Sequence, residues 1–288
     1  MRKILTLIFI IILLVLAFLW IRSCYQASEK STTIQNEQAA TSAKKDEDIQ
    51  RYNLGVRKSQ SENNGPCDTL AVREYVINNY PSGTYLVDFD KTLTFNVPKS
   101  AVIYYNRGGN QYIFALIARS KPGKRFIEPK NVVGYDQSFI DLDSTNLGTA
   151  FFYLTLFKCE ENHLSFIWEA PVPSHGGLNR MYMEKWAYLG TPYVKIDFHY
   201  ARGIGHIDYN YFLVNGIDSL PHLLMTWEGI NFKRTLANVN SDKYPDYYEF
   251  VYYDTGKRIS LADSVAFIWN RKDSLYVNPK NKRQTRPY

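Results

Sequence analysis

An uncharged and almost wholly apolar run extends from residue 4 to residue 21, directly after the pair Arg2-Lys3. A run of this length is close to the minimum for a membrane-spanning helix. A basic start followed by an apolar run is also how a secretory signal begins. Because the positive charge precedes the run, we expect the N-terminus in the cytoplasm and the bulk of the chain outside it.

Beyond residue 83 the apolar runs are short, rich in β-branched and aromatic residues, and bounded by turn residues. Examples are residues 101–105, 209–214 and 247–253, which end at Asn-Arg-Gly-Gly, Asn-Gly and Asp-Thr-Gly turns. Runs of this kind are typical of strands joined by hairpins. The sequence therefore predicts a mainly β chain built from antiparallel hairpins.

A single helix is predicted before this region. Asp68 is a suitable N-cap, residues 70–77 carry a mixed apolar face, and residues 78–83 form a cluster of helix-breaking residues. The fold class is thus mainly β with one short N-terminal helix.

Three segments of the chain resemble one another. Each starts with an aliphatic strand that contains Asp or Asn and ends at Trp168, Trp227 or Trp269. The separation in sequence from that Asp or Asn to the Trp is 27, 30 and 31 residues. Successive units begin about 41 to 56 residues apart, a repeat length that is typical of propeller blades or stacked sheets. We therefore expect weak repeats in a propeller-like or stacked-sheet arrangement. The alternative is that aromatic-rich hairpins look alike by composition alone.

Composition divides the chain into four parts. Residues 1–24 form the signal or membrane anchor. Residues 25–66 are rich in Ser, Gln, Asn, Glu and Lys, which predicts a disordered polar linker. Residues 67–279 contain nearly all of the 23 Tyr, 16 Phe and 5 Trp and form one β-rich extracytoplasmic domain. Residues 280–288 are a basic tail.

The net charge of +6 is modest, and the basic tail supplies much of it. For an exported chain this charge argues against a nucleic-acid partner. Cys67 and Cys159 are the only cysteines of the β-rich domain. They either pair in an oxidising compartment or serve as small buried apolar residues.

The end of the apolar run, Ile21-Arg22-Ser23-Cys24, resembles a bacterial lipobox. The resemblance implies cleavage before Cys24 and lipidation of its sulfur, although Arg22 stands where a small or aliphatic residue is usual. The alternatives are an uncleaved signal anchor and free secretion. The missing small-residue cleavage site argues against free secretion.

A candidate metal loop spans residues 238–249, with oxygen-bearing residues at the spacing of a twelve-residue calcium loop. Its core resembles the loops of FG-GAP and VCBS repeats, which occur in extracellular β-propellers. The spacing implies Ca²⁺ held by the side chains of Asn238, Asn240, Asp242, Asp246 and Glu249 and by the backbone carbonyl of Tyr244. Lys243 replaces the usual turn glycine, and position 1 is Asn rather than Asp. A turn that holds no metal is the alternative.

A second motif, Asp88-Phe-Asp90-Lys-Thr92, resembles motif I of the haloacid dehalogenase-type phosphohydrolases. The resemblance implies Asp88 as nucleophile and Asp90 as general acid/base, with Mg²⁺ between them and the phosphate. That fold requires strands alternating with long helices, and no helical periodicity follows Gly83.

The five histidines are scattered, and no nucleophile elbow is present. We therefore expect a membrane-tethered extracytoplasmic β-domain that is a non-catalytic binding or structural module of the cell envelope. An envelope protein or a glycan is the expected partner, contacted through exposed Tyr and Trp. A Mg²⁺-dependent phosphohydrolase is the alternative.

Overall fold

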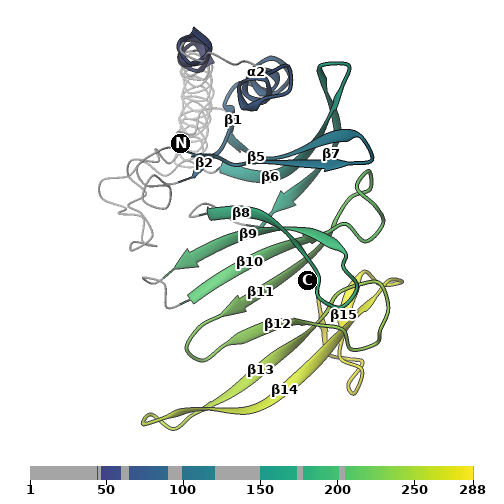
Figure 1. Ribbon diagram of the computed structural model, residues 1–288. Helices are drawn as coiled ribbons and strands as arrows, with labels where there is room; N and C mark the ends of the chain where they lie inside the picture. The colour runs from purple at the N-terminus through teal and green to yellow at the C-terminus, as the bar shows by residue number, and fades with distance from the viewer. Residues whose placement is uncertain are drawn as a thin grey trace, which may run out of the picture.

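The computed structural model describes residues 44, 47–59, 65–89, 99–120, 150–173, 178–200 and 205–287. Strands dominate these residues, and every strand pairing among them is antiparallel (Figure 1). The predicted mainly β, antiparallel fold class is confirmed. Within this described part, no helix is both long and apolar enough to cross a membrane, and residues 4–21 lie outside it.

The first sheet has five strands, in which β1 and β4 both pair with one edge of β5, followed by β6 and β7. The strands are β1 (Thr84–Leu86), β4 (Val102–Arg107), β5 (Asn110–Ser120), β6 (Ala150–Glu160) and β7 (His163–Val172). A two-stranded sheet of β2 (Asp88–Phe89) and β3 (Lys99–Ser100) lies beside it. Both faces of β5 are buried, because its successive side chains enter two different hydrophobic clusters.

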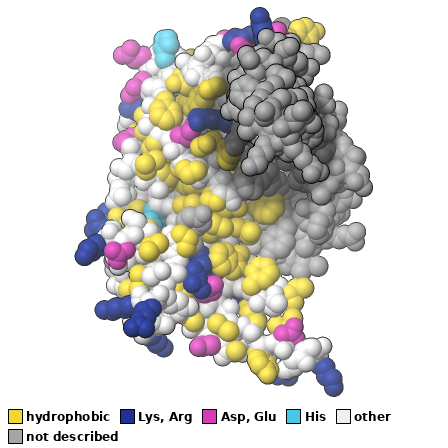
Figure 2. All heavy atoms as spheres, turned by 180° about the vertical axis from the view of Figure 1, so that it is seen from behind, with side chains coloured by type: hydrophobic (Ala, Val, Ile, Leu, Met, Phe, Trp, Pro, Cys, Tyr) yellow, Lys and Arg dark blue, Asp and Glu magenta, His cyan; other side chains and the backbone are white. Residues whose placement is uncertain are grey.

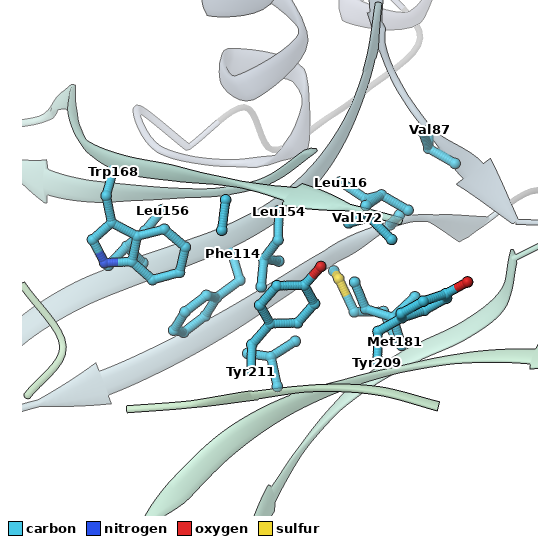
Figure 3. Packing of buried hydrophobic residues seen from close by; sticks show 14 of the residues in the cluster. Val87, Phe114, Leu116, Leu154, Leu156, Trp168, Val172, Met181, Tyr209 and Tyr211 are labelled. Carbon is cyan, nitrogen blue, oxygen red and sulfur yellow. The ribbon is translucent and has the colours of Figure 1, made fainter. Parts of the chain in front are cut away.

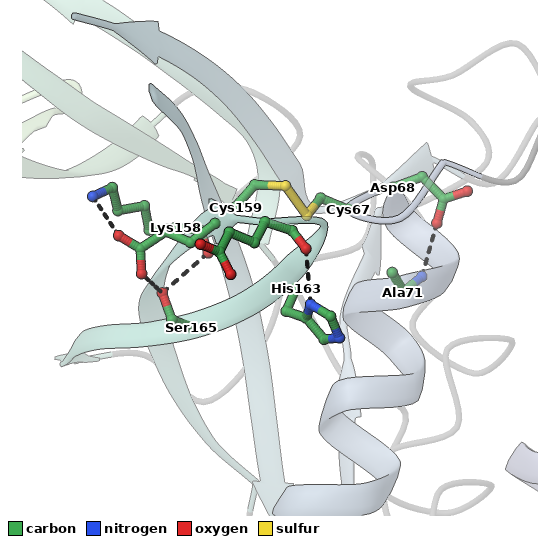
Figure 4. The surroundings of a disulfide bond; sticks show 9 residues. Cys67, Asp68, Ala71, Lys158, Cys159, His163 and Ser165 are labelled. Carbon is green, nitrogen blue, oxygen red and sulfur yellow. Dashed lines mark hydrogen bonds and ion pairs between the residues drawn. A yellow bond between two sulfur atoms is a disulfide. The ribbon is translucent and has the colours of Figure 1, made fainter. Parts of the chain in front are cut away.

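One of these clusters lies under helix α2 (Thr69–Asn79), at the position where the sequence predicts a helix. The Asp68 carboxylate accepts a hydrogen bond from Ala71 N at 2.8 Å, as expected of an N-cap. Val72 and Val76 are buried against the sheet. Of the two alternatives for the cysteines, the structure has the disulfide, which joins the start of α2 to β6 (Figure 4).

Residues 47–59 are also helical, although they fall inside the segment predicted to be a disordered linker. The prediction for this part of the linker differs from the structure because tertiary contacts stabilise the helix. Leu54 is buried, Lys58 pairs with Glu74 at 2.7 Å, and Arg51 donates to the Asn78 side chain at 3.0 Å. Tertiary contacts of this kind are not visible in local composition.

The second large sheet has nine strands, each paired with its neighbours in sequence. They are β8 (Leu178–Lys185), β9 (Pro192–Tyr200), β10 (Gly205–Phe212), β11 (His222–Glu228), β12 (Lys233–Ala237), β13 (Asp246–Asp254), β14 (Ile259–Asn270), β15 (Leu275–Val277) and β16 (Thr285–Arg286). The last strand, β16, lies within the predicted basic tail, so residues 285–286 of that tail belong to the sheet.

The main hydrophobic core lies between the two large sheets (Figure 3). Phe114, Leu154 and Trp168 face it from the first sheet, and Tyr209 and Tyr211 face it from the second. The indole N–H of Trp168 is satisfied in this core, since it donates to Ile217 O at 2.7 Å.

The nine-stranded sheet divides into two halves after β11. Strands β11 and β12 pair only through Trp227–Arg234 and Glu228–Lys233. A third hydrophobic cluster lies between the halves and is built from β8–β11 on one side and β12–β15 on the other. Its members are Trp186, Tyr193, Phe212, Leu224, Tyr247, Phe267 and Tyr276.

The predicted repeat units map onto this sheet in part. The unit ending at Trp227 covers β9–β11, and the unit ending at Trp269 covers β12–β14, so the two lie side by side in one meander. Trp168 lies in the first sheet, and the start of its unit at residue 139 falls outside the described residues.

Candidate functional site

The predicted calcium loop connects β12 to β13, and its oxygen atoms bind backbone and amide N–H groups of the loop itself. Asp242 N donates to Asn240 Oδ1 at 3.0 Å, and Tyr244 N donates to Asp242 Oδ1 at 2.7 Å. The Asn240 side-chain amide donates to the other Asp242 oxygen at 3.0 Å. Turns closed in this way are characteristic of Asn and Asp side chains.

Asp246 is fully buried and joins three parts of the chain. Its Oδ2 accepts from Val239 N at 2.8 Å and Asn240 N at 3.2 Å, and its Oδ1 accepts from Trp269 N at 3.2 Å. Burial raises the pKa of Asp246, while the three backbone hydrogen bonds act in the opposite direction. The carboxylate thus fastens the loop to β14.

Two further predicted ligands, Glu249 and Asn238, have other surroundings. Glu249 lies opposite Arg234 in the β12–β13 register, and its Oε2 is 3.7 Å from Arg234 and 3.6 Å from Arg286. Asn238 Oδ1 is buried without a hydrogen-bond partner. The structure brings Asn240, Asp242 and Asp246 together, whereas the Glu249 carboxylate lies beside Arg234 and Arg286.

Tyr244 packs its ring against His222 and Trp269, beside the cluster between the two halves of the sheet. Its ring centre is 5.4 Å from that of His222, whose Nε2 is 2.7 Å from the Tyr276 hydroxyl. Burial lowers the pKa of His222 to about 4, so the imidazole is neutral at neutral pH. These contacts identify His222 as a core residue.

In the described residues, no group of three or more His, Cys, Asp or Glu side chains is placed to hold a metal ion. In this structure the oxygens of Asn240, Asp242 and Asp246 accept hydrogen bonds from amide groups, whereas a calcium ion needs several negative oxygens free to coordinate it. Calcium binding at residues 238–249 stays a prediction that experiment decides.

We expect millimolar CaCl₂ to leave the melting temperature of the protein unchanged, because the loop is already closed by hydrogen bonds. A site filled at a hundred times its Kd would add about 2.7 kcal/mol and raise the melting temperature by roughly 5–10 °C. Thermal unfolding with CaCl₂ and with EDTA measures this. A calcium-dependent rise that disappears in Asp242→Ala would establish the metal site.

Asp88, the nucleophile implied by the phosphohydrolase resemblance, is held by α2 and β3. It pairs with the Arg73 guanidinium and accepts from Ser100 Oγ at 2.8 Å, and Arg73 also donates to Ser100 Oγ at 2.6 Å. Asp90 lies outside the described residues, as does Cys24. The antiparallel pairing of β2 with β3 also differs from the parallel sheet of that family.

Among the described residues, a buried cluster of charged side chains on β8, β9 and β10 is one that sequence reasoning missed. Asp197 on β9 and Asp208 on β10 lie directly opposite each other in the strand register. They are only 2% and 5% exposed. Two like charges in this position destabilise a sheet unless cations or protons compensate them.

Lys195 is the central counter-charge of this pair. Its Nζ lies 2.9 Å from Asp208 Oδ2 and 3.9 Å from Asp197 Oδ1. Arg180 on β8 approaches Asp197 at 3.2 Å, and His206 on β10 approaches Asp208 at 3.7 Å. Strands β8, β9 and β10 are therefore linked by one ion network.

The network shifts the proton affinities of its members. Burial, followed by the charge of Asp208, raises the pKa of Asp197. Burial by itself would lower the pKa of Lys195, but its hydrogen bond and ion pair with Asp208 raise it. A lysine held charged beside two shielded carboxylates is suited to fixing strand positions, since both acids are nearly inaccessible to a ligand.

A sequence signal for this network does exist. Lys195 and Asp197 alternate with the apolar Val194 and Ile196, which places both polar residues on one face of β9. The alternation alone does not reveal the network, because the polar face of β9 meets Asp208 only through the pairing of β9 with β10. Searches for related proteins give no further guide, because no family model, curated protein or solved structure matches this chain.

Proposed function

We propose that this chain is a membrane-tethered extracytoplasmic β-domain that serves as a non-catalytic binding or structural module of the cell envelope. The observation that carries the proposal is the Cys67–Cys159 disulfide. Disulfides form and persist in oxidising compartments outside the cytoplasm. The apolar run at residues 4–21 is consistent with such a compartment, because it has the features of a membrane anchor or export signal.

The arrangement of charged groups supports a non-catalytic role. Among the described residues, the acids that stand out by burial or by motif have structural partners: Arg73 for Asp88, Lys195 for Asp208, and three backbone amides for Asp246. A general acid or nucleophile must reach a substrate, and these groups are committed to structural contacts. The phosphohydrolase alternative also lacks support from the antiparallel sheets.

The proposal includes the repeat arrangement. Strands β9–β11 and β12–β14 would be two copies of one three-stranded unit, each ending in a strand that carries Trp227 or Trp269. Support comes from the cluster between the halves of the sheet, where one unit packs side chains against the next as propeller blades or stacked sheets do.

Cell fractionation with protease accessibility tests the proposal. We expect the full chain to remain with the membranes and to be degraded by protease added outside the cytoplasmic membrane, while a cytoplasmic marker stays intact. Cys67 and Cys159 should resist alkylation until they are reduced. If Cys24 is lipidated, Cys24→Ser should remove fatty-acid labelling. If residues 4–21 form an uncleaved helical anchor, the same variant should stay in the membrane fraction. A protease-resistant domain with freely alkylated Cys67 and Cys159 would refute the proposal.

A further inference from the structure

The last half of the nine-stranded sheet exposes an apolar face. On this face, which we name the C-terminal face, Tyr248, Phe250 and Tyr252 alternate along β13, and Leu261 and Ile268 join them from β14. Tyr252 lies opposite Leu261 in the register. Tyr248 and Leu261 are 38% and 57% exposed, and the other three are partly exposed.

Most of the other sheet surface in the described residues is covered, although Val251 and Tyr253, on the opposite side of the β13–β14 hairpin, are 46% and 65% exposed. The first sheet is covered by α2 and by the main core, and the inner face of β12–β15 packs on β8–β11. Figure 2 views the molecule from behind and shows hydrophobic side chains over its middle and lower part, with Lys and Arg at the lower corners. Exposed apolar surface of this kind is typical of an interaction site.

Positive charge is concentrated in the same part of the chain. Residues 233–287 contain eleven Lys and Arg and six Asp and Glu, so they carry +5 of the chain's net +6. Lys257 and Arg258 are exposed in the β13–β14 turn at one end of the C-terminal face. Lys272, Lys282 and Arg283 are exposed beyond the other end, after β14.

An apolar face with aromatic residues and basic residues at its ends matches the interface of an anionic bilayer. Tyr side chains favour the headgroup level, and each Lys or Arg near an anionic surface contributes about 1 kcal/mol of attraction. A second copy of the chain fits less well, because both ends of the C-terminal face are basic and would repel the same ends of a partner.

The chain length outside the described residues permits this contact. Twenty-five residues separate the apolar run from residue 47, and at full extension they span about 80 Å. A compact body of about 240 residues is roughly 45 Å across. The tether is therefore long enough for the C-terminal face to reach the membrane that holds the N-terminus.

We infer that the C-terminal face lies on the anionic headgroup layer of the membrane in which the chain is anchored. This inference rests on the proposed membrane tethering. The apolar residues of β13 and β14 enter the interfacial layer, and the Lys and Arg side chains at both ends pair with lipid phosphates. The tether and the face together give two attachments to one membrane.

Tryptophan quenching in nanodiscs tests the inference on the full chain. Leu261→Trp places the probe on the C-terminal face. Tyr253→Trp is the matched control, because Tyr253 is 65% exposed in the same hairpin but points to the opposite side. Both variants and the wild type are placed in nanodiscs of phosphatidylcholine alone or with 30% phosphatidylglycerol, each with acyl chains brominated close to the headgroup.

In the anionic nanodiscs we expect strong quenching of the added fluorescence in Leu261→Trp and little in Tyr253→Trp. The difference should disappear in pure phosphatidylcholine and in high salt. Adding Lys257→Glu and Arg258→Glu to Leu261→Trp should weaken the contact by roughly thirtyfold, given the attraction per cation.

Two results would overturn the inference. One is equal quenching of the two probes in anionic nanodiscs. The other is a blue shift of the Leu261→Trp emission that grows with protein concentration without lipid, which would assign the face to a second copy. Trp20 lies in the apolar run and reports the anchor separately. Quenching of wild-type fluorescence with no quenching of the Leu261→Trp probe would remove only this inference, whereas failure to enter nanodiscs would remove the proposed tethering.

Discussion

Replacing Lys195 with Met is expected to lower the free energy of unfolding by about 3–5 kcal/mol at pH 7.5. The substitution keeps the length and apolar part of the side chain but removes the cation between Asp197 and Asp208. Two carboxylates that are almost inaccessible to water then face each other across β9 and β10. Urea unfolding monitored by fluorescence measures the loss.

The deficit should depend on pH in a definite direction. Burial and the charge of Asp208 raise the pKa of Asp197 above its ordinary value of 3.8, and Lys195 acts against that rise. For an acid whose pKa is raised by folding, the stabilising contribution is complete below the unfolded pKa and is lost as the pH rises through the folded pKa. Removing Lys195 raises the pKa further, so the variant should approach the wild type as the pH falls toward 4.

Lys233→Met is the matched control. Lys233 pairs with Glu228 at 2.8 Å on the same sheet, but its partner is 50% exposed. An exposed pair contributes at most about 1 kcal/mol, so the control should unfold close to the wild type at every pH. Equal losses in the two variants, or a deficit in Lys195→Met that does not change with pH, would show that the acid pair does not need Lys195.

Removing the disulfide is expected to have a comparable effect. Cys67 and Cys159 are 92 residues apart in sequence, and closing a loop of that length restricts the unfolded chain by about 4.5 kcal/mol. The double variant Cys67→Ser, Cys159→Ser should therefore unfold at a much lower urea concentration. The slope of the transition should increase, because the open chain exposes more surface.

Reduction of the wild type provides the control. Once a thiol assay shows that the wild-type protein is reduced, it should unfold at the same urea concentration as the serine variant. Added reductant should not change the urea midpoint of the variant. A reduced wild type that keeps its oxidised midpoint would mean that α2 and β6 are held equally well by the cluster beneath the helix.

Local patterns were sufficient for much of the fold. The β-branched and aromatic runs before Asn215-Gly216 and Asp254-Thr255-Gly256 correspond to β10 and β13, each followed by its partner strand. Asp68 caps α2 as expected. These features depend on residues close together in sequence, which is why single-sequence reasoning captures them.

Features that depend on distant partners were harder to predict. Leu54 is one apolar residue in a polar segment, and its helix is stabilised by contacts to α2 that composition does not contain. Asp246 has the spacing of a metal ligand, but whether its oxygens meet a cation or backbone amides depends on where β14 passes. The opposition of Asp197 and Asp208 depends on the register of two strands.

The order of strands in the nine-stranded sheet affects how the chain acquires its structure. Each strand from β9 to β16 pairs with the strand just before it, so the sheet can be built one hairpin at a time. Short sequence separations between paired strands favour fast folding. If the chain is exported N-terminus first, β8–β11 can form while the later residues are still crossing the membrane. Because β11 and β12 pair through only two residue pairs, the boundary between them would then separate two units that fold one after the other.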